Sequence, residues 1–229
     1  MGEPPGSVAF ARAARALGIK GAAAASAPMR VGSGETYAKL FMTRAKLHLV
    51  LVAVRETGVL PLRSIDVFAM DPTYGEGFVG SRAEEPETLD AEGRPLPRRY
   101  LAGRIRSIED LDGDGRMEST IQIRVSRMCC AIGEIETMQR VIVDLETGKK
   151  QADLLLTTKT VSYLIKGTME LKDRDGDGRD DLVYAEVFRD RIEGKGRRST
   201  KLAIYDPKTD RYVGDLPTWQ PTDCCPQPD

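Results

Sequence analysis

The sequence predicts an all-β fold of blade-like antiparallel β repeats, with three recognisable units of about 60 residues each. The first observation is an acidic glycine-rich loop that occurs twice, starting at Asp110 and at Asp173, a spacing of 63 residues. The second is the pattern that follows each loop. Residues 119–125 alternate between polar and apolar, and residues 182–188 are rich in β-branched and aromatic side chains. A unit that recurs at a fixed period in this way indicates one supersecondary motif used several times.

The chain divides into a leader, a repeat domain and a tail. The leader, residues 1–36, is rich in Ala and Arg and is expected to be flexible or helical. The repeat domain, 37–220, comprises a degenerate unit and two full units, 37–99, 100–162 and 163–220, and the tail is 221–229. The degenerate unit keeps a strand at 47–54 and a strand and turn at 66–75, but it has no acidic loop. Residues 81–99, with Pro86, Pro95 and Pro97, indicate an inserted loop.

Matching landmarks flank the two loops and support the repeat. A Tyr-Leu pair begins ten residues before each loop, at Tyr100 and Tyr163. A turn aspartate lies 34 residues after the first loop start, at Asp144, and 33 residues after the second, at Asp206. The predicted architecture is therefore β-propeller-like, either closed or as a partial, open propeller.

Both loops carry carboxylates at positions 1, 3, 5 and 9, with glycine at position 6 where the chain must turn sharply. Like charges repel by about 0.8 kcal/mol per pair at 5 Å even in water, and a hard cation relieves that repulsion. Calcium, which takes six to eight oxygen ligands, suits the pattern, so two calcium ions are expected per chain. The predicted ligands are Asp110, Asp112, Asp114 and Glu118 in the first loop and Asp173, Asp175, Asp177 and Asp181 in the second, completed by the position-7 carbonyls of Arg116 and Arg179. The two arginine side chains are expected to point outward.

A helical EF-hand is excluded by two details. Its twelfth position should be a bidentate Glu, whereas position 12 here is Ile121 or Tyr184. The residues after each loop also have the pattern of a strand and not of a helix. The sequence therefore predicts calcium loops that lead into β-strands.

The string from Asp173 to Val183, Asp-x-Asp-Gly-Asp-Gly-Arg-x-Asp-Leu-Val, resembles the calcium loop of FG-GAP or VCBS-type repeats. The first loop departs from that pattern, with Glu118 at position 9 and Ser-Thr in place of Leu-Val. The resemblance covers roughly residues 100–215, and 37–80 only weakly. It implies integrin-α-like propeller blades, calcium in the loops at the blade edges, and a role in stability, adhesion or ligand display. Propellers of the family usually have about seven blades, and only three units are recognisable here.

Composition is that of an ordinary soluble globular protein, with 229 residues, 41% hydrophobic, and a formal net charge of −1. Near-zero net charge gives no argument for nucleic-acid binding, and no apolar run reaches the roughly 18 residues of a membrane helix. Residues 7–29 fit a poor export signal, an organelle-type transit segment or a flexible or helical leader. The expected location is extracellular, periplasmic or at the cell surface.

The four cysteines form two adjacent pairs. Zinc sites usually space their cysteines as Cys-x-x-Cys, so the pairs argue against a zinc site. They are Cys129, Cys130, Cys224 and Cys225. One interpretation is a disulfide that ties the C-terminal tail to the segment after the first loop. The alternative is unpaired thiols in a reducing compartment.

Other candidate sites are weak. His48 is the only histidine and lies in an apolar strand, so no Ser/His/Asp constellation is available. Carboxylates committed to calcium are poor general acids, which argues against glycoside hydrolysis. The basic segment 189–201 is predicted to be a solvated hairpin, with a contact for an acidic partner as the alternative. Trp219 is expected to cover the last sheet.

These observations predict a non-enzymatic, calcium-binding β-repeat module with a structural, adhesion or ligand-display role. Two alternatives remain open at this point. One is a carbohydrate-binding or accessory domain whose loops frame a sugar site. The other is a subunit of a larger assembly that completes a propeller with protein partners.

Overall fold

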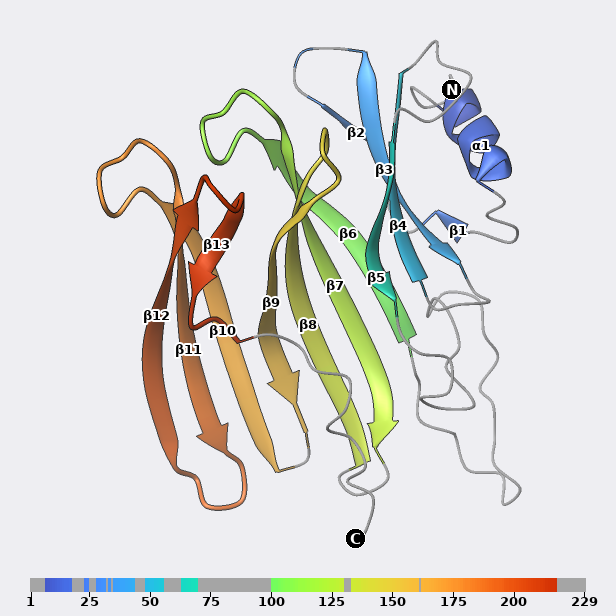
Figure 1. Ribbon diagram of the computed structural model, residues 1–229. Coiled ribbons are helices and arrows are strands. Elements are labelled where there is room, and N and C mark those ends of the chain that lie inside the picture. The colour runs from blue at the N-terminus through green and yellow to red at the C-terminus, as the bar shows by residue number, and fades with distance from the viewer. Residues whose placement is uncertain are drawn as a thin grey trace, which may run out of the picture.

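The computed structural model describes residues 7–17, 23–24, 28–31, 33, 35–43, 48–55, 63–69, 100–129, 133–160 and 162–217. Within these residues the protein consists of one helix and two antiparallel β-sheets (Figure 1). The prediction of a mostly-β chain is confirmed. The described residues contain no helix that is long and apolar enough to cross a membrane.

The first sheet lies next to the only helix of the described residues and is built on two long central strands. Its elements are α1 (Ser7–Ala16), β1 (Ala23–Ala24), β2 (Met29–Arg30), β3 (Thr36–Thr43), β4 (His48–Arg55) and β5 (Arg63–Ala69). The order is β1-β3-β4-β5, and β2 also pairs with β3. One face of this sheet is covered by α1, whose Phe10 is buried against Phe41 and Val52.

The second sheet is an eight-stranded meander in which every strand pairs with its neighbour in sequence. Its strands are β6 (Tyr100–Glu109), β7 (Glu118–Cys129), β8 (Gly133–Asp144), β9 (Lys150–Lys159), β10 (Tyr163–Lys172), β11 (Asp181–Asp190), β12 (Gly196–Asp206) and β13 (Arg211–Gly214). β9 and β10 share only three register pairs, 164 with 159 through 166 with 157, whereas β10 and β11 share their whole length. The sheet therefore divides into two four-stranded halves, β6–β9 and β10–β13, which separate visibly in Figure 1.

Side chains of the half β6–β9 point alternately to its two faces, and another layer packs on each face. Along β8, Val141 and Val143 contact the first sheet through a core that includes Leu40 and Leu51. Ile142, between them, points the other way into a second core with Leu182 and Tyr184 of β11. The order of layers is thus α1, the first sheet, β6–β9 and β10–β13 (Figure 1).

Four connections lie at one end of these stacked strands (Figure 1). Two are the acidic loops, residues 110–118 (loop 1) and 173–181 (loop 2), whose last residues are the first residues of β7 and β11. The other two are the turns β8–β9 and β12–β13, which begin after Asp144 and Asp206. The predicted strands after the loops are confirmed as β7 and β11. The repeat therefore brings the segments that carry acidic residues to one end of the sheets.

Several predictions lie outside the described residues. They are the inserted loop 81–99, the turn 71–75, Trp219 and the tail 221–229, together with Cys130, Cys224 and Cys225. Cys129 is the last residue of β7. The disulfide stays a prediction for this reason. Within the leader, α1 is helical, and β1 and β2 pair with β3.

Candidate metal centre

The two loops share one backbone conformation, which their glycines and carboxylates produce together. The glycines at positions 4 and 6 of each loop have positive φ angles, from 70° at Gly113 to 87° at Gly115. Residues with a Cβ rarely adopt this region. The position-1 carboxylate accepts a hydrogen bond from the position-6 amide, at 3.0 Å in loop 1 and 3.1 Å in loop 2. The carboxylates at positions 3, 5 and 9 accept equivalent bonds from the amides at positions 5, 7 and 2. Each loop is therefore folded around its own acidic side chains.

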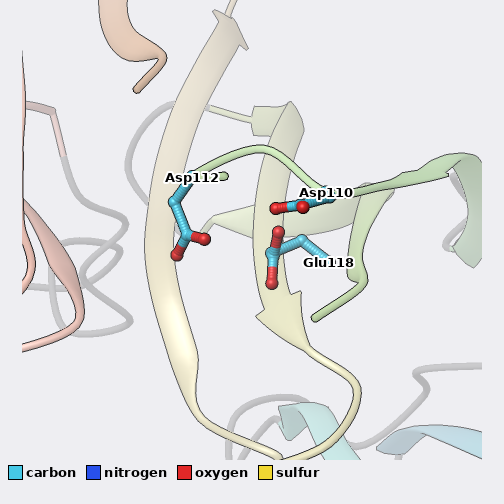
Figure 2. A group of neighbouring side chains, drawn as sticks. All are labelled: Asp110, Asp112 and Glu118. Atoms are coloured by element: carbon cyan, nitrogen blue, oxygen red, sulfur yellow. The ribbon is translucent and has the colours of Figure 1, made fainter. Parts of the chain in front are cut away.

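In loop 1 the side chains of Asp110, Asp112 and Glu118 converge (Figure 2), and each offers an oxygen within 4.8 Å of the other two. Asp110 is exposed, whereas Asp112 and Glu118 are fully buried. Such a group of hard oxygen donors fits a divalent cation that prefers oxygen ligands. The three residues are all ligands that the sequence predicted.

Glu118 carries the clearest electrostatic signal in the site. Its Oε2 accepts the amide of Leu111 at 2.8 Å, but no described residue donates a hydrogen bond to its Oε1. Burial raises the pKa of Glu118 to about 8, and the charges of Asp112, Asp144 and Asp114 act in the same direction, while the Leu111 amide opposes them. A buried carboxylate oxygen without a donor is costly, and a cation placed between Glu118 and its neighbours would remove that cost.

Loop 2 repeats the same triangle with Asp173, Asp175 and Asp181. Only Asp181 is buried, and both of its oxygens are already bonded, to the amides of Arg174 at 3.1 Å and Tyr205 at 3.2 Å. The two loops therefore match in geometry and differ in environment. Loop 1 is partly buried at the boundary of two sheet halves, and loop 2 is more exposed.

The position-5 carboxylates, Asp114 and Asp177, lie outside the two triangles. Each instead forms an ion pair with the arginine at position 7, Asp114 with Arg116 and Asp177 with Arg179, the second pair at 3.4 Å. The prediction that these arginines point outward does not hold for Arg116. Its Nε lies 3.0 Å from Oδ2 of Asp144, which is fully buried, so the guanidinium turns inward to neutralise that charge.

Around loop 1 the structure adds residues that were not predicted as part of the site. Gln151 of β9 donates through Nε2 to Asp112 at 3.3 Å and to Asp210 at 2.8 Å. Tyr205 of β12 donates its hydroxyl to Asp210 at 2.8 Å, and Lys149 and Arg116 form ion pairs with the same carboxylate. Asp210 has a φ of 51° and occupies the turn position that Gly148 holds in the preceding unit. This aspartate, at a position where the preceding unit has glycine, is the sequence signal that could have drawn attention to Asp210.

The charges around Asp210 determine its ionisation. Burial pushes its pKa upward, but hydrogen bonds from Gln151 and Tyr205 and the positive charges of Lys149 and Arg116 outweigh burial and lower the pKa. Asp210 is therefore charged at neutral pH, and it joins the β12–β13 turn to loop 1 of the neighbouring sheet half. Its contribution to stability is present above the unfolded pKa of about 3.9 and is lost as the pH falls through the lower folded value.

The two loops also touch each other directly. The amide of Asp180 in loop 2 donates to the carbonyl of Leu111 in loop 1 at 3.3 Å. The Leu111 side chain is buried in the same core as Leu182 and Tyr205. Leu111 occupies position 2 of loop 1, where loop 2 has the exposed Arg174. This apolar residue anchors loop 1 to the next sheet half.

Replacing Arg116 with glutamine is expected to lower the free energy of unfolding by about 1–3 kcal/mol, because the change leaves buried Asp144 without its cationic partner. The matched control is Arg179→Gln in loop 2. Its partner Asp177 has a side chain that is 38% exposed, so the expected loss is about 0–1 kcal/mol. Urea denaturation of both variants measures the difference. Equal losses would show that Arg116 has no special role between the sheet halves.

Fold and site together define a class: a mostly-β protein of two antiparallel sheets with two acidic clusters that could hold metal ions. No protein-family model, no curated protein and no solved structure matches the chain.

Proposed function

We propose that the protein is a non-enzymatic calcium-binding β-repeat module that holds two calcium ions, one in each acidic loop. The observation that carries this proposal is the buried Oε1 of Glu118, which has no hydrogen-bond donor among the described residues, in a side chain that converges with Asp110 and Asp112. The second loop repeats the arrangement with Asp173, Asp175 and Asp181. Two copies of one carboxylate triangle, placed by the same backbone turn, support a common ligand.

Calcium fits these donors better than the other common divalent ions. All of the side-chain donors are carboxylate oxygens, which calcium and magnesium prefer over zinc or copper. Magnesium demands near-ideal octahedral geometry and keeps its waters, whereas calcium accepts flexible loop ligands. The carbonyls of Arg116 and Arg179 at position 7 would supply further oxygens. Extracellular calcium modules bind in the range of about 10⁻⁴–10⁻³ M, so an exported or surface-associated module would be occupied there.

The proposed role of the ions is structural. Loop 1 connects β6 to β7 and contacts Leu182 and Tyr205 of the next sheet half through Leu111. An ion in loop 1 would therefore stabilise both the loop and the packing of the sheet halves, and its binding free energy would add to folding. We interpret the two halves and the first sheet as three blades of an open propeller. Their exposed surfaces would serve adhesion or ligand display.

Thermal unfolding with calcium and with a chelator tests the proposal. Two sites filled at 100 times their Kd stabilise the folded state by about 2.7 kcal/mol each. For a chain of this length that corresponds to a rise in Tm of about 10–20 °C. Native mass spectrometry of the calcium-loaded protein is expected to show two ions per chain.

Magnesium at the same concentration is the matched control, and it is expected to raise Tm by less than half as much. An unchanged Tm in calcium, together with a mass that shows no bound ion, would overturn the proposal. A single bound ion would limit the proposed calcium binding to loop 1.

A further inference from the structure

Among the residues that the structure describes, no other layer covers one apolar face of the last sheet half. This surface, called here the end face, consists of the side chains of β10–β13 that point away from Tyr184. Its apolar centre is formed by Val183, Val187, Leu202, Ile204 and Val213. These residues are neighbours across the strands, because Val183 pairs with Leu202 and Ile204 pairs with Val213. Leu202 is 44% exposed and Val213 is 56% exposed, which is unusual for large apolar side chains in the middle of a sheet.

The repeat shows what a surface of this kind does elsewhere in the same chain. In the preceding half, the cross-strand pair Ile142 and Ala152 occupies the place that Ile204 and Val213 occupy in the last half. Ile142 is fully buried because β10–β13 packs on that face. The end face therefore has the composition of a surface that packs against another sheet. It continues an interface already present within the molecule.

The opposite end of the stack limits how a second chain can bind. The outer face of the first sheet is covered by α1, with Phe10 only 1% exposed. A second copy cannot add its first sheet to the end face unless α1 moves away, so open head-to-tail stacking is blocked. An arrangement that leaves α1 in place brings the two end faces together, which gives a closed two-fold dimer.

Charge along the strands selects the orientation of such a pair. At one end of the face Lys166 and Arg198 flank Val187 in register on both sides, and Arg189 lies beside them. All three are exposed. The other end, residues 170–181, carries six carboxylates and three basic side chains, so it keeps a net charge of −1 when one calcium ion is bound. A two-fold axis across the strands places the basic end of one copy on the acidic end of the other.

We propose that a second copy of this chain covers the end face, with the two β10–β13 halves packed face to face and their strands antiparallel. Apolar contact at Leu202, Ile204 and Val213 supplies affinity, and the basic and acidic ends supply orientation. This proposal goes beyond calcium binding, because it assigns a self-association surface to the end of the stack.

Sedimentation velocity of the full chain in calcium buffer, from about 1 to 100 µM, tests the proposal. Wild type is expected to change from monomer to dimer as its concentration rises. Leu202→Glu is expected to weaken the dimer about tenfold or more, because it buries an unpaired charge at the centre of the interface. The matched control is Ile192→Glu. Ile192 is 77% exposed but lies in the β11–β12 turn, off the end face, so its dimer is expected to match wild type.

Additional variants separate a loss of dimer from a loss of folding. If circular dichroism shows that Leu202→Glu is unfolded, the double variant Leu202→Thr and Val213→Thr replaces it, since threonine retains β propensity while it removes apolar area. Arg198→Glu is expected to weaken the dimer as well, and raised salt should do the same. A wild-type monomer throughout the concentration range would overturn the proposal. A dimer that the folded Leu202 variants leave unchanged would also overturn it.

Discussion

Replacing Glu118 with glutamine is expected to remove about half of the calcium-induced rise in Tm and to leave the metal-free protein at least as stable as wild type. Glutamine keeps the size of the side chain and an oxygen that can accept the Leu111 amide bond of 2.8 Å. It removes a carboxylate that is fully buried among Asp110 and Asp112, so the repulsion in the metal-free loop falls. The same change removes a charged ligand. We expect a loss of about 2.7 kcal/mol of stabilisation at a calcium concentration 100 times the Kd. Melting curves with calcium and with chelator measure both effects.

The matched control is Glu109→Gln, which changes an exposed glutamate adjacent to loop 1. Its melting curves are expected to coincide with those of wild type in both buffers. Asp181→Asn provides the corresponding change in loop 2. A Glu118→Gln protein that keeps the full calcium response would exclude Glu118 as a ligand. A large loss of stability in chelator would show that its role in the metal-free fold is structural.

Replacing Tyr184 with alanine is expected to cost about 3–5 kcal/mol of unfolding free energy, the largest effect of any single change proposed for this protein. Tyr184 is the largest fully buried side chain of the described residues. Its ring lies directly over Gly167 of β10, where a Cβ would collide with it. It also contributes to the core between β6–β9 and β10–β13 together with Ile142 and Leu154. Alanine leaves a cavity at the centre of that interface. The midpoint of urea denaturation measures the loss.

Tyr184→Phe separates packing from hydrogen bonding. The hydroxyl has one hydrogen to donate, and two acceptors lie within reach, the carbonyl of Leu155 at 3.2 Å and the carboxylate of Glu186 at 3.1 Å. Phenylalanine removes this donor but fills nearly the same volume, so the expected loss is about 1 kcal/mol. If alanine cost no more than phenylalanine, the two sheet halves would not be held together by packing at this position. The loops would then lie on a less rigid scaffold than the structure indicates.

The strands that follow the loops and the conformation of the loops were predictable from sequence because they depend on neighbouring residues. Alternation over 119–125 specifies a strand with two different faces, and β7 has that alternation. Glycine at positions 4 and 6 permits positive φ, and each loop carboxylate bonds an amide no more than seven residues away. Asp110, Asp112 and Glu118 were therefore recognisable as a group.

The partners that surround loop 1 could not be predicted in the same way. Gln151 reaches Asp112 from 39 residues further along the chain, and Asp210 lies a further 59 residues beyond Gln151. Gln151 gives no signal of a site at the start of a strand, and the aspartate at 210, which stands where the preceding unit has Gly148, signals an unusual turn but does not identify its partners. Both residues meet loop 1 only because two sheet halves pack face to face. Arg116 points inward for the same reason, since the packing buries Asp144 beside it.

The sequence by itself determined that the chain is mostly β, that two matched loops gather carboxylates, and that strands follow them, because each of these properties depends on contacts within one unit. In the sequence alone the two loops look equivalent. Only the tertiary structure decided that loop 1 is buried against the next sheet half and loop 2 is exposed on the last one, since that difference depends on which neighbour each unit packs against. The physical reason is position in the stack. An inner unit has sheets on both faces, and the last unit leaves Leu202 and Val213 in contact with solvent.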